Sequence, residues 1–107
     1  MSGRLSDDPI LQRIRASLGA IYGDRIERLV LFGSRARGDA SEASDYDVAV
    51  FLQDLTDRWS EFHRLADLRT DILAETGAFL EARPFRAGSY RDLTPLMHEI
   101  RRDGVDL

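Results

Sequence analysis

The chain has 107 residues, enough for a single domain with a modest core, and we expect that domain to span residues 1–107. Cysteine is absent and all 15 basic residues are arginine, which excludes disulfides, thiolate metal sites and mechanisms that need a lysine. The net charge of −4 disfavours direct DNA binding, because affinity for the duplex comes largely from neutralising phosphates.

The N-terminal third predicts a helix and then a buried strand. Asp7 or Asp8 can cap a helix that places Pro9 at its first position and runs to about Tyr22. The strand covers roughly residues 26–32, which are rich in aliphatic side chains. The apolar stripe of the helix consists of Ile10, Ile14, Leu18 and Ile21.

A second apolar run, residues 48–52, predicts another buried strand after a short helical turn and a polar loop at Asp39–Ser44. Thr56 or Asp57 can then cap a long helix that ends near Glu75. The buried stripe of that helix is predicted to be Phe62, Leu65, Leu68 and Ile72.

Two residues of the long helix fall off this stripe. Glu61 is expected to lie outside the buried face. Trp59 could be exposed; we favour a role in capping the edge of the core, with partner docking as the alternative.

Residues 79–85 predict a third strand, and Pro84 places that strand at an edge of the sheet or near its own end. A last helix is expected at about residues 93–102, with an apolar stripe of Leu93, Leu96, Met97 and Ile100. This order of elements predicts an α/β (α+β) fold, a small mixed sheet of three to four strands with helices packed on it.

The residues between the first two strands carry the chemistry. Gly33 and Ser34 follow the first strand, and Asp45 and Asp47 open the second. Positions i and i+2 of a strand share a face, so the two carboxylates lie roughly 6–7 Å apart along the backbone. Paired carboxylates suit Mg²⁺ with bound substrate phosphates. These residues therefore predict a site for a metal-bound nucleotide, although both acids could instead be capping residues at a strand boundary.

Arg35 and Arg37 supply charges suited to phosphate oxygens, and we expect one of them, preferably Arg37, to contact phosphate. Ser44 either orients Asp45 by a hydrogen bond or serves as a plain turn residue.

The other polar candidates near the motif are weaker. Tyr46, between the two acids, must point to the opposite face and is expected in the core. His63 and His98 have no second ligand at metal spacing and are expected on helix surfaces.

The segment Gly-Ser-Arg-Ala-Arg-Gly followed by Ser-Asp-Tyr-Asp-Val resembles the minimal nucleotidyltransferase family, which has the DNA polymerase beta nucleotidyltransferase fold. In that family a later strand reads apolar-Asp-apolar-apolar-Pro-apolar, and its acid completes the site. Aligned on Pro84, this acid falls on Glu81. The resemblance implies that Asp45, Asp47 and Glu81 are catalytic and bind two Mg²⁺ ions. Alternatively, Glu81 is an edge-strand acid paired with Arg83 or another arginine.

The resemblance further implies ATP as substrate, bound at Gly33, Ser34, Arg35, Arg37 and Ser44. It implies a HEPN-domain toxin as partner in a hetero-oligomer, silenced by binding or by AMP transfer onto its tyrosine. The leading hypothesis is an antitoxin with protein adenylyltransferase activity that releases pyrophosphate. Two alternatives are an antitoxin that acts by binding alone and a nucleotidyltransferase acting on a small molecule or an RNA end. A polar N-terminus and the lack of a long apolar run predict a cytoplasmic protein without membrane contact.

Overall fold

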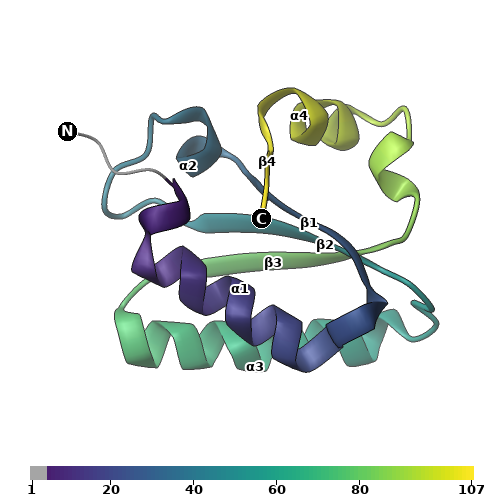
Figure 1. Ribbon diagram of the computed structural model, residues 1–107, viewed down its shortest axis with the longest axis horizontal. Coiled ribbons are helices and arrows are strands. Elements are labelled where there is room, and N and C mark those ends of the chain that lie inside the picture. The colour runs from purple at the N-terminus through teal and green to yellow at the C-terminus, as the bar shows by residue number, and fades with distance from the viewer. Residues whose placement is uncertain (1–4) are drawn as a thin grey trace.

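Four strands form one mixed sheet in the computed structural model, which describes residues 5–107 (Figure 1). The strand order is β3-β2-β1-β4, in which β1 is antiparallel to β2 and β4 while β2 is parallel to β3. This arrangement confirms the predicted fold class; residues 1–4, including the polar N-terminus, lie outside the described part. The strands are β1 (Ile26–Phe32), β2 (Tyr46–Leu52), β3 (Leu80–Arg86) and β4 (Val105–Asp106). The α-helices are α1 (Pro9–Tyr22), α2 (Ser34–Arg37), α3 (Arg58–Thr76) and α4 (Pro95–Asp103), and short 3₁₀ turns lie at Leu5–Asp7, Gly23–Arg25 and Ser89–Arg91.

The helix boundaries follow the predicted capping residues. The Asp8 carboxylate accepts hydrogen bonds from the N–H groups of Ile10 and Leu11, at 2.9 and 3.3 Å, and so caps α1. Asp57 caps α3 in the same way, and Gly77 ends that helix with a φ of 76°, which glycine adopts without steric cost.

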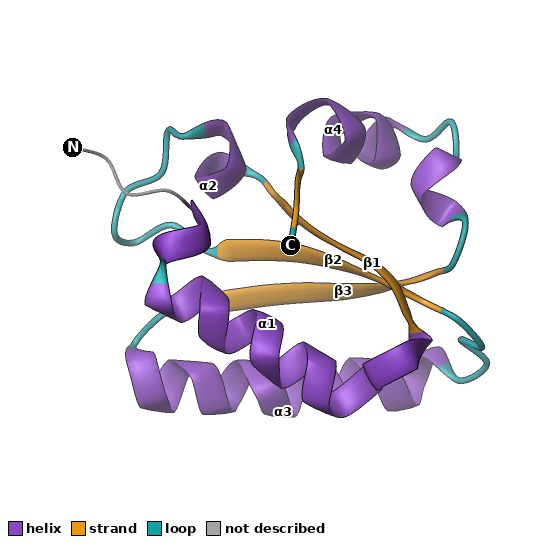
Figure 2. Cartoon of the chain, in the orientation of Figure 1, coloured by secondary structure: helices purple, strands orange, loops and turns teal. Residues whose placement is uncertain are grey.

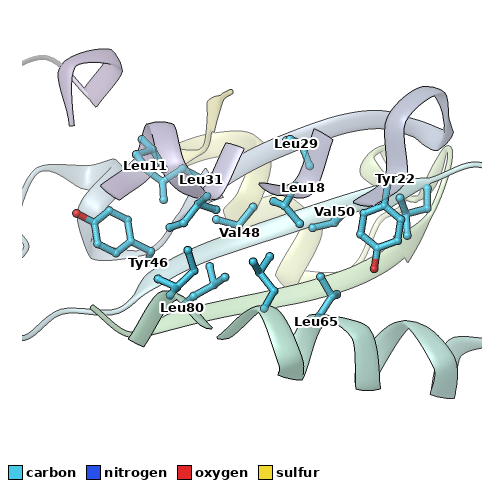
Figure 3. Packing of buried hydrophobic residues seen from close by; sticks show 14 of the residues in the cluster. Leu11, Leu18, Tyr22, Leu29, Leu31, Tyr46, Val48, Val50, Leu65 and Leu80 are labelled. Atoms are coloured by element: carbon cyan, nitrogen blue, oxygen red, sulfur yellow. The ribbon is translucent and has the colours of Figure 1, made fainter. Parts of the chain in front are cut away.

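The sheet separates two apolar layers (Figure 2). Helices α1 and α3 cover one face, where a row of buried side chains extends from Tyr46 to Tyr22 (Figure 3). Helix α4 covers part of the other face, where Met97 and Ile100 pack against Phe51 and its neighbours. Among the described helices, none has both the length and the apolar character needed to cross a membrane.

Three side chains of α3 correct the sequence prediction. Glu61 is buried, because the guanidinium of Arg25 lies 3.1 Å and that of Arg64 3.8 Å from its carboxylate oxygens. Phe62 is 45% exposed and therefore does not belong to the buried stripe. Trp59 is 75% exposed, as the sequence allowed, which disfavours the role of capping the edge of the core.

The C-terminal segment also differs from the prediction. Helix α4 begins at Pro95 with Thr94 as its cap, so Leu93 precedes the helix and is 96% exposed rather than part of the stripe. The short strand β4, which was not predicted, pairs Val105 with Leu31 of β1.

Candidate active site

The turn after β1 is built around a glycine. Gly33 has a φ of 75° and a ψ of −159°, a conformation that side chains disfavour. A Cβ at this position would overlap the carboxylate of Asp47 on β2. The Gly33 carbonyl accepts hydrogen bonds from the N–H groups of Ala36 and Arg37, both at 3.1 Å, and thereby starts α2. Glycine thus lets the backbone of this turn approach the Asp47 carboxylate closely.

The start of α2 has no side-chain cap. The N–H groups of Ala36 and Arg37 are bound to the Gly33 carbonyl, whereas those of Ser34 and Arg35 come before the first intrahelical bond and are suited to anionic oxygens. Ser34, at the first position of α2, adds a hydroxyl there. The turn therefore has the donors expected of a triphosphate-binding loop.

Asp47 is the central acid of the site. It is half-buried on β2, whereas Asp45 precedes the strand and is exposed. Burial raises the pKa of the Asp47 carboxyl, and the charge of Asp45 adds to this effect. Arg83 opposes the rise, while Glu81 and Glu99 reinforce it. A cation bound beside Asp47 would reduce the repulsion among these carboxylates.

Glu81 lies beside Asp47 on the neighbouring strand. The parallel register pairs the two residues directly, while Phe32 at the end of β1 pairs with Asp47 on its other side. Asp47 is an even number of positions from Phe51 on β2, and Glu81 is an even number of positions from Phe85 on β3. Because alternate residues of a strand share a face, both acids lie on the face of the sheet that α4 covers, where Phe51 and Phe85 pack. A Glu81 carboxylate oxygen lies 3.9 Å from the guanidinium of Arg69 on α3.

Glu99 was not a sequence candidate. It lies on α4, next to the buried stripe residue Ile100, and its charge reaches Asp47 only because α4 packs on this face of the sheet. No pattern in the sequence around Glu99 predicts that its charge lies near Asp47.

The structure separates the roles of the two arginines. Arg35 donates to the carbonyl of Ser44 at 3.0 Å and to the carbonyls of Ser41 and Glu42 at 3.3 Å each, so it fastens the loop before β2. Its guanidinium also stacks on the Tyr46 ring at 4.0 Å from the centroid.

Arg37 is more exposed and lies 3.3 Å from a carboxylate oxygen of Asp39. Ser44 accepts a hydrogen bond from the N–H of Ser41 at 3.0 Å, as a turn residue does. Arg37 thus remains the arginine that is freer to meet phosphate.

A hydrogen bond ties the motif to α1. Tyr46 is buried, as predicted, and its hydroxyl donates to Asp8 at 2.6 Å. Burial and this hydrogen bond raise the pKa of Tyr46 to about 12. Asp8 therefore has a second role, beyond the predicted helix cap. His63 and His98 are exposed on α3 and α4, as expected.

The chemistry of these side chains fits Mg²⁺. Carboxylate oxygens are its preferred protein ligands, and the raised pKa of Asp47 indicates a position where a cation is favourable. Within residues 5–107, no three acidic or histidine side chains are gathered closely enough to enclose an ion as they stand. Asp45 and Asp47, with Glu81 at the adjacent register position, are the donors available here.

A glycine turn against an acid, with a further acid on the adjacent parallel strand, defines a nucleotidyltransferase-type site. The family model described as "Polymerase beta, Nucleotidyltransferase" matches residues 20–105 of this chain. The chain therefore belongs to the polymerase beta nucleotidyltransferase family, as the Gly33–Asp47 motif indicated.

Two similar proteins come from Methanocaldococcus jannaschii. The chain is 31% identical over 78 residues to "Putative protein adenylyltransferase MJ0604", covering 73% of this chain and 72% of the relative. It is 37% identical over 46 residues to "Putative protein adenylyltransferase MJ0141", covering 43% of this chain and 46% of that relative. The second match thus spans less than half of its relative.

Solved structures share the fold. The toxin–antitoxin MntA–HpeT superimposes with a TM-score of 0.63 at 16% identity, over 89% of this chain and 70% of the other. A toxin–antitoxin structure with AMP-PNP gives a TM-score of 0.61 at 19% identity, with the same coverage.

Proposed function

We propose that this protein is an antitoxin that transfers AMP from ATP to a HEPN-type toxin, with release of pyrophosphate and in the presence of Mg²⁺. The observation that carries the proposal is the placement of Asp47 between the Gly33 turn and Glu81. One side of this acid offers donors for a triphosphate, and the other side offers a carboxylate for an acceptor.

The triphosphate would bind at the turn, with its oxygens facing the N–H groups of α2, the Ser34 hydroxyl and Arg37. Asp45, Asp47 and Glu81 would hold two Mg²⁺ ions. When bound, such ions neutralise the triphosphate and lower the pKa of an attacking hydroxyl.

Transfer would proceed by displacement at the α-phosphorus. A bond forms between the acceptor oxygen and phosphorus, the bond from phosphorus to the bridging oxygen breaks, and pyrophosphate leaves. Glu81 would orient the acceptor hydroxyl and receive its proton, because it lies on the side of Asp47 opposite the Gly33 turn. Positioning and electrostatics supply most of the rate in such transfers.

The comparisons support the choice of acceptor and nucleotide. The M. jannaschii relatives carry the name protein adenylyltransferase, and the similar folds include toxin–antitoxin structures, one with AMP-PNP, an ATP analogue. Among the described residues, the hollow that reaches Asp45 measures about 310 Å³, which is too small to enclose both a nucleotide and a large acceptor, so a partner protein would complete the site. A chain without cysteine is suited to the reducing cytoplasm, where such a partner would reside.

The test is to incubate the protein with its purified HEPN-type partner, ATP and Mg²⁺, and to weigh the partner by intact-protein mass spectrometry. We expect the partner to gain one or more AMP units, and we expect Asp47→Asn to abolish the gain. If the partner is inactivated at equal stoichiometry with no gain in mass, adenylyl transfer is not the mechanism.

A second candidate function is inhibition by binding alone. The contact between Glu81 and Arg69 favours it, because a carboxylate that already has a cationic neighbour is less available for catalysis. In that case the Asp45→Asn, Asp47→Asn double variant would neutralise the partner with the same dose dependence as the wild type, and neither protein would neutralise more than its own molar amount.

A further inference from the structure

Helix α3 has a second apolar stripe besides the one that packs on the sheet. Trp59, Phe62, Ala66 and Leu73 recur at heptad spacing, and the three large side chains are 75%, 45% and 41% exposed. The solvent face of a helix is normally polar, so an exposed apolar stripe indicates a surface that binds another molecule.

This stripe borders two hollows. A cavity of about 680 Å³ lies between Trp59 and Phe62 of α3, Phe85 of β3 and Leu96 of α4. A smaller one, of about 310 Å³, lies against Leu73 and Phe79 and reaches Asp45.

Arg69 and Glu81 line both cavities. The two hollows, here together called the outer groove, lie along α3 and the edge of the sheet, and the smaller one reaches the acidic site at Asp45.

The edge strand beside the groove is poorly suited to accept another strand. The carbonyl of Phe79 and the N–H of Ala87 form hydrogen bonds with β2. The backbone N–H and C=O groups of the odd-numbered residues of β3 therefore point towards β2, and those of the even-numbered residues point towards the free edge. Pro84 occupies one of these outward positions and has no N–H to donate. An occupant must therefore be bound through side chains, as a helix in a groove is, rather than by strand addition.

The charged residues of the groove indicate the charge of the ligand that it binds. Arg58, Arg69 and Arg83 line its larger hollow together with one acid, Glu81, and the smaller hollow adds Asp45. Within residues 5–107, neither Arg58 nor Arg83 forms a salt bridge. A locally basic surface on a chain of net charge −4 favours an acidic ligand, and it disfavours a second copy of itself, which would place arginine against arginine.

We propose that the outer groove docks an amphipathic helix of the protein partner, with apolar residues on Trp59, Phe62 and Leu73 and acidic residues on the arginines. The identity of that partner as the AMP acceptor rests on the proposed function. Docking also acts on the site: an acid of the partner that binds Arg69 draws this arginine from Glu81, whose carboxylate is then free. The groove ends at Asp45 and Glu81, so a docked partner lies next to the acids.

The docking test measures binding of the purified HEPN-type partner by calorimetry, without nucleotide. We expect the Trp59→Ala, Phe62→Ala double variant to weaken binding by at least ~30-fold, as loss of a central aromatic pair does. Arg58→Glu with Arg69→Glu should weaken it similarly and reduce its dependence on salt. The matched controls are Leu93→Ala, an exposed apolar residue outside the groove, and Arg15→Glu on α1, and both should bind within twofold of wild type.

Binding of the aromatic double variant within threefold of wild type would overturn the proposal. So would a concentration-dependent dimer of the protein alone that these substitutions dissolve, or tighter binding of a single-stranded oligonucleotide than of the partner. A thermal shift with Mg²⁺–ATP keeps the two proposals separate, since the Trp59→Ala, Phe62→Ala variant, which changes none of the acids, should retain it. If the wild type binds the partner through the groove but never modifies it, the groove stands and adenylyl transfer fails.

Discussion

The Tyr46 hydroxyl donates a 2.6 Å hydrogen bond to Asp8, so the first residue of β2 is tied to the cap of α1. The guanidinium of Arg35 stacks on the ring of the same tyrosine and also donates a hydrogen bond to the loop before Asp45. The loop that bears the acids is thus anchored to the helical layer through one side chain.

Tyr46→Phe keeps the ring and removes this hydrogen bond. We expect a loss of about 1 kcal/mol in the free energy of unfolding, measured in urea at pH 7. The folded state raises the pKa of Tyr46 to about 12 from 10.0, so its contribution is complete below pH 10 and is lost as the pH rises towards 12. The variant should therefore lose less stability than wild type between pH 10 and 12. An equal alkaline loss in both proteins would contradict this assignment.

Gly33→Ala tests the close approach to Asp47. The backbone conformation and the overlap with the carboxylate should together cost about 3 kcal/mol or more and should reduce Mg²⁺–ATP binding. Gly38→Ala is the matched control, because its φ is also positive, at 84°, but no atom lies within 4 Å of the added Cβ. We expect it to cost about 1 kcal/mol and to leave nucleotide binding intact. Equal effects of the two substitutions would show that the contact with Asp47 is unimportant.

Asp47→Asn removes a charge that the fold disfavours. Because the pKa of Asp47 is raised, its charged form lowers stability once the pH exceeds its ordinary value of 3.8. The variant without nucleotide should therefore melt at a higher temperature than wild type at pH 7, with no difference below pH 3.8. It should also lose the thermal shift produced by Mg²⁺–ATP. An unchanged shift would rule out Asp47 as a metal ligand.

Glu81→Gln tests the third acid. If Glu81 orients the acceptor and takes its proton, transfer should slow by at least ~10²-fold, as when one preorganised electrostatic group is lost. Nucleotide binding should weaken less, because in the proposed mechanism the turn and the first two acids would hold the triphosphate. A single-turnover assay measures the two effects separately, and transfer within a few-fold of wild type would return Glu81 to a structural role with Arg69.

The two motif arginines should respond differently to alanine. Arg35→Ala should increase amide hydrogen exchange across residues 39–45, because it removes the donors that bind three loop carbonyls. Arg37→Ala should weaken ATP binding without changing that exchange. The reverse pattern would assign the phosphate contact to Arg35.

Most of the fold could be predicted because its determinants are local. Asp8, Asp57 and Gly77 mark helix ends through contacts within a few residues, and Pro84 marks the edge strand by its missing donor. The family pattern, aligned on Pro84, predicted Glu81 as the third acid, and the register of β2 with β3 places Glu81 beside Asp47.

The remainder depends on neighbours that are distant in sequence. Glu61 is buried because Arg25, in the turn between α1 and β1, reaches it, and no periodicity in α3 reveals this pairing. The second bond of Asp8, from the Tyr46 hydroxyl, arises in the same way. Leu93 was misplaced because Thr94 and Pro95 start the helix after it.

The parallel pairing of β2 with β3 has a consequence for the order in which the protein folds. The Gly33 turn meets Asp47 through an antiparallel pair joined by a short loop, whereas Glu81 joins them only after the whole of α3 has crossed the sheet. Contacts across a long connection form later, because more chain entropy is lost in closing it. We therefore expect the chain to assemble its phosphate-binding half first, and to gain its acceptor half when the crossover closes.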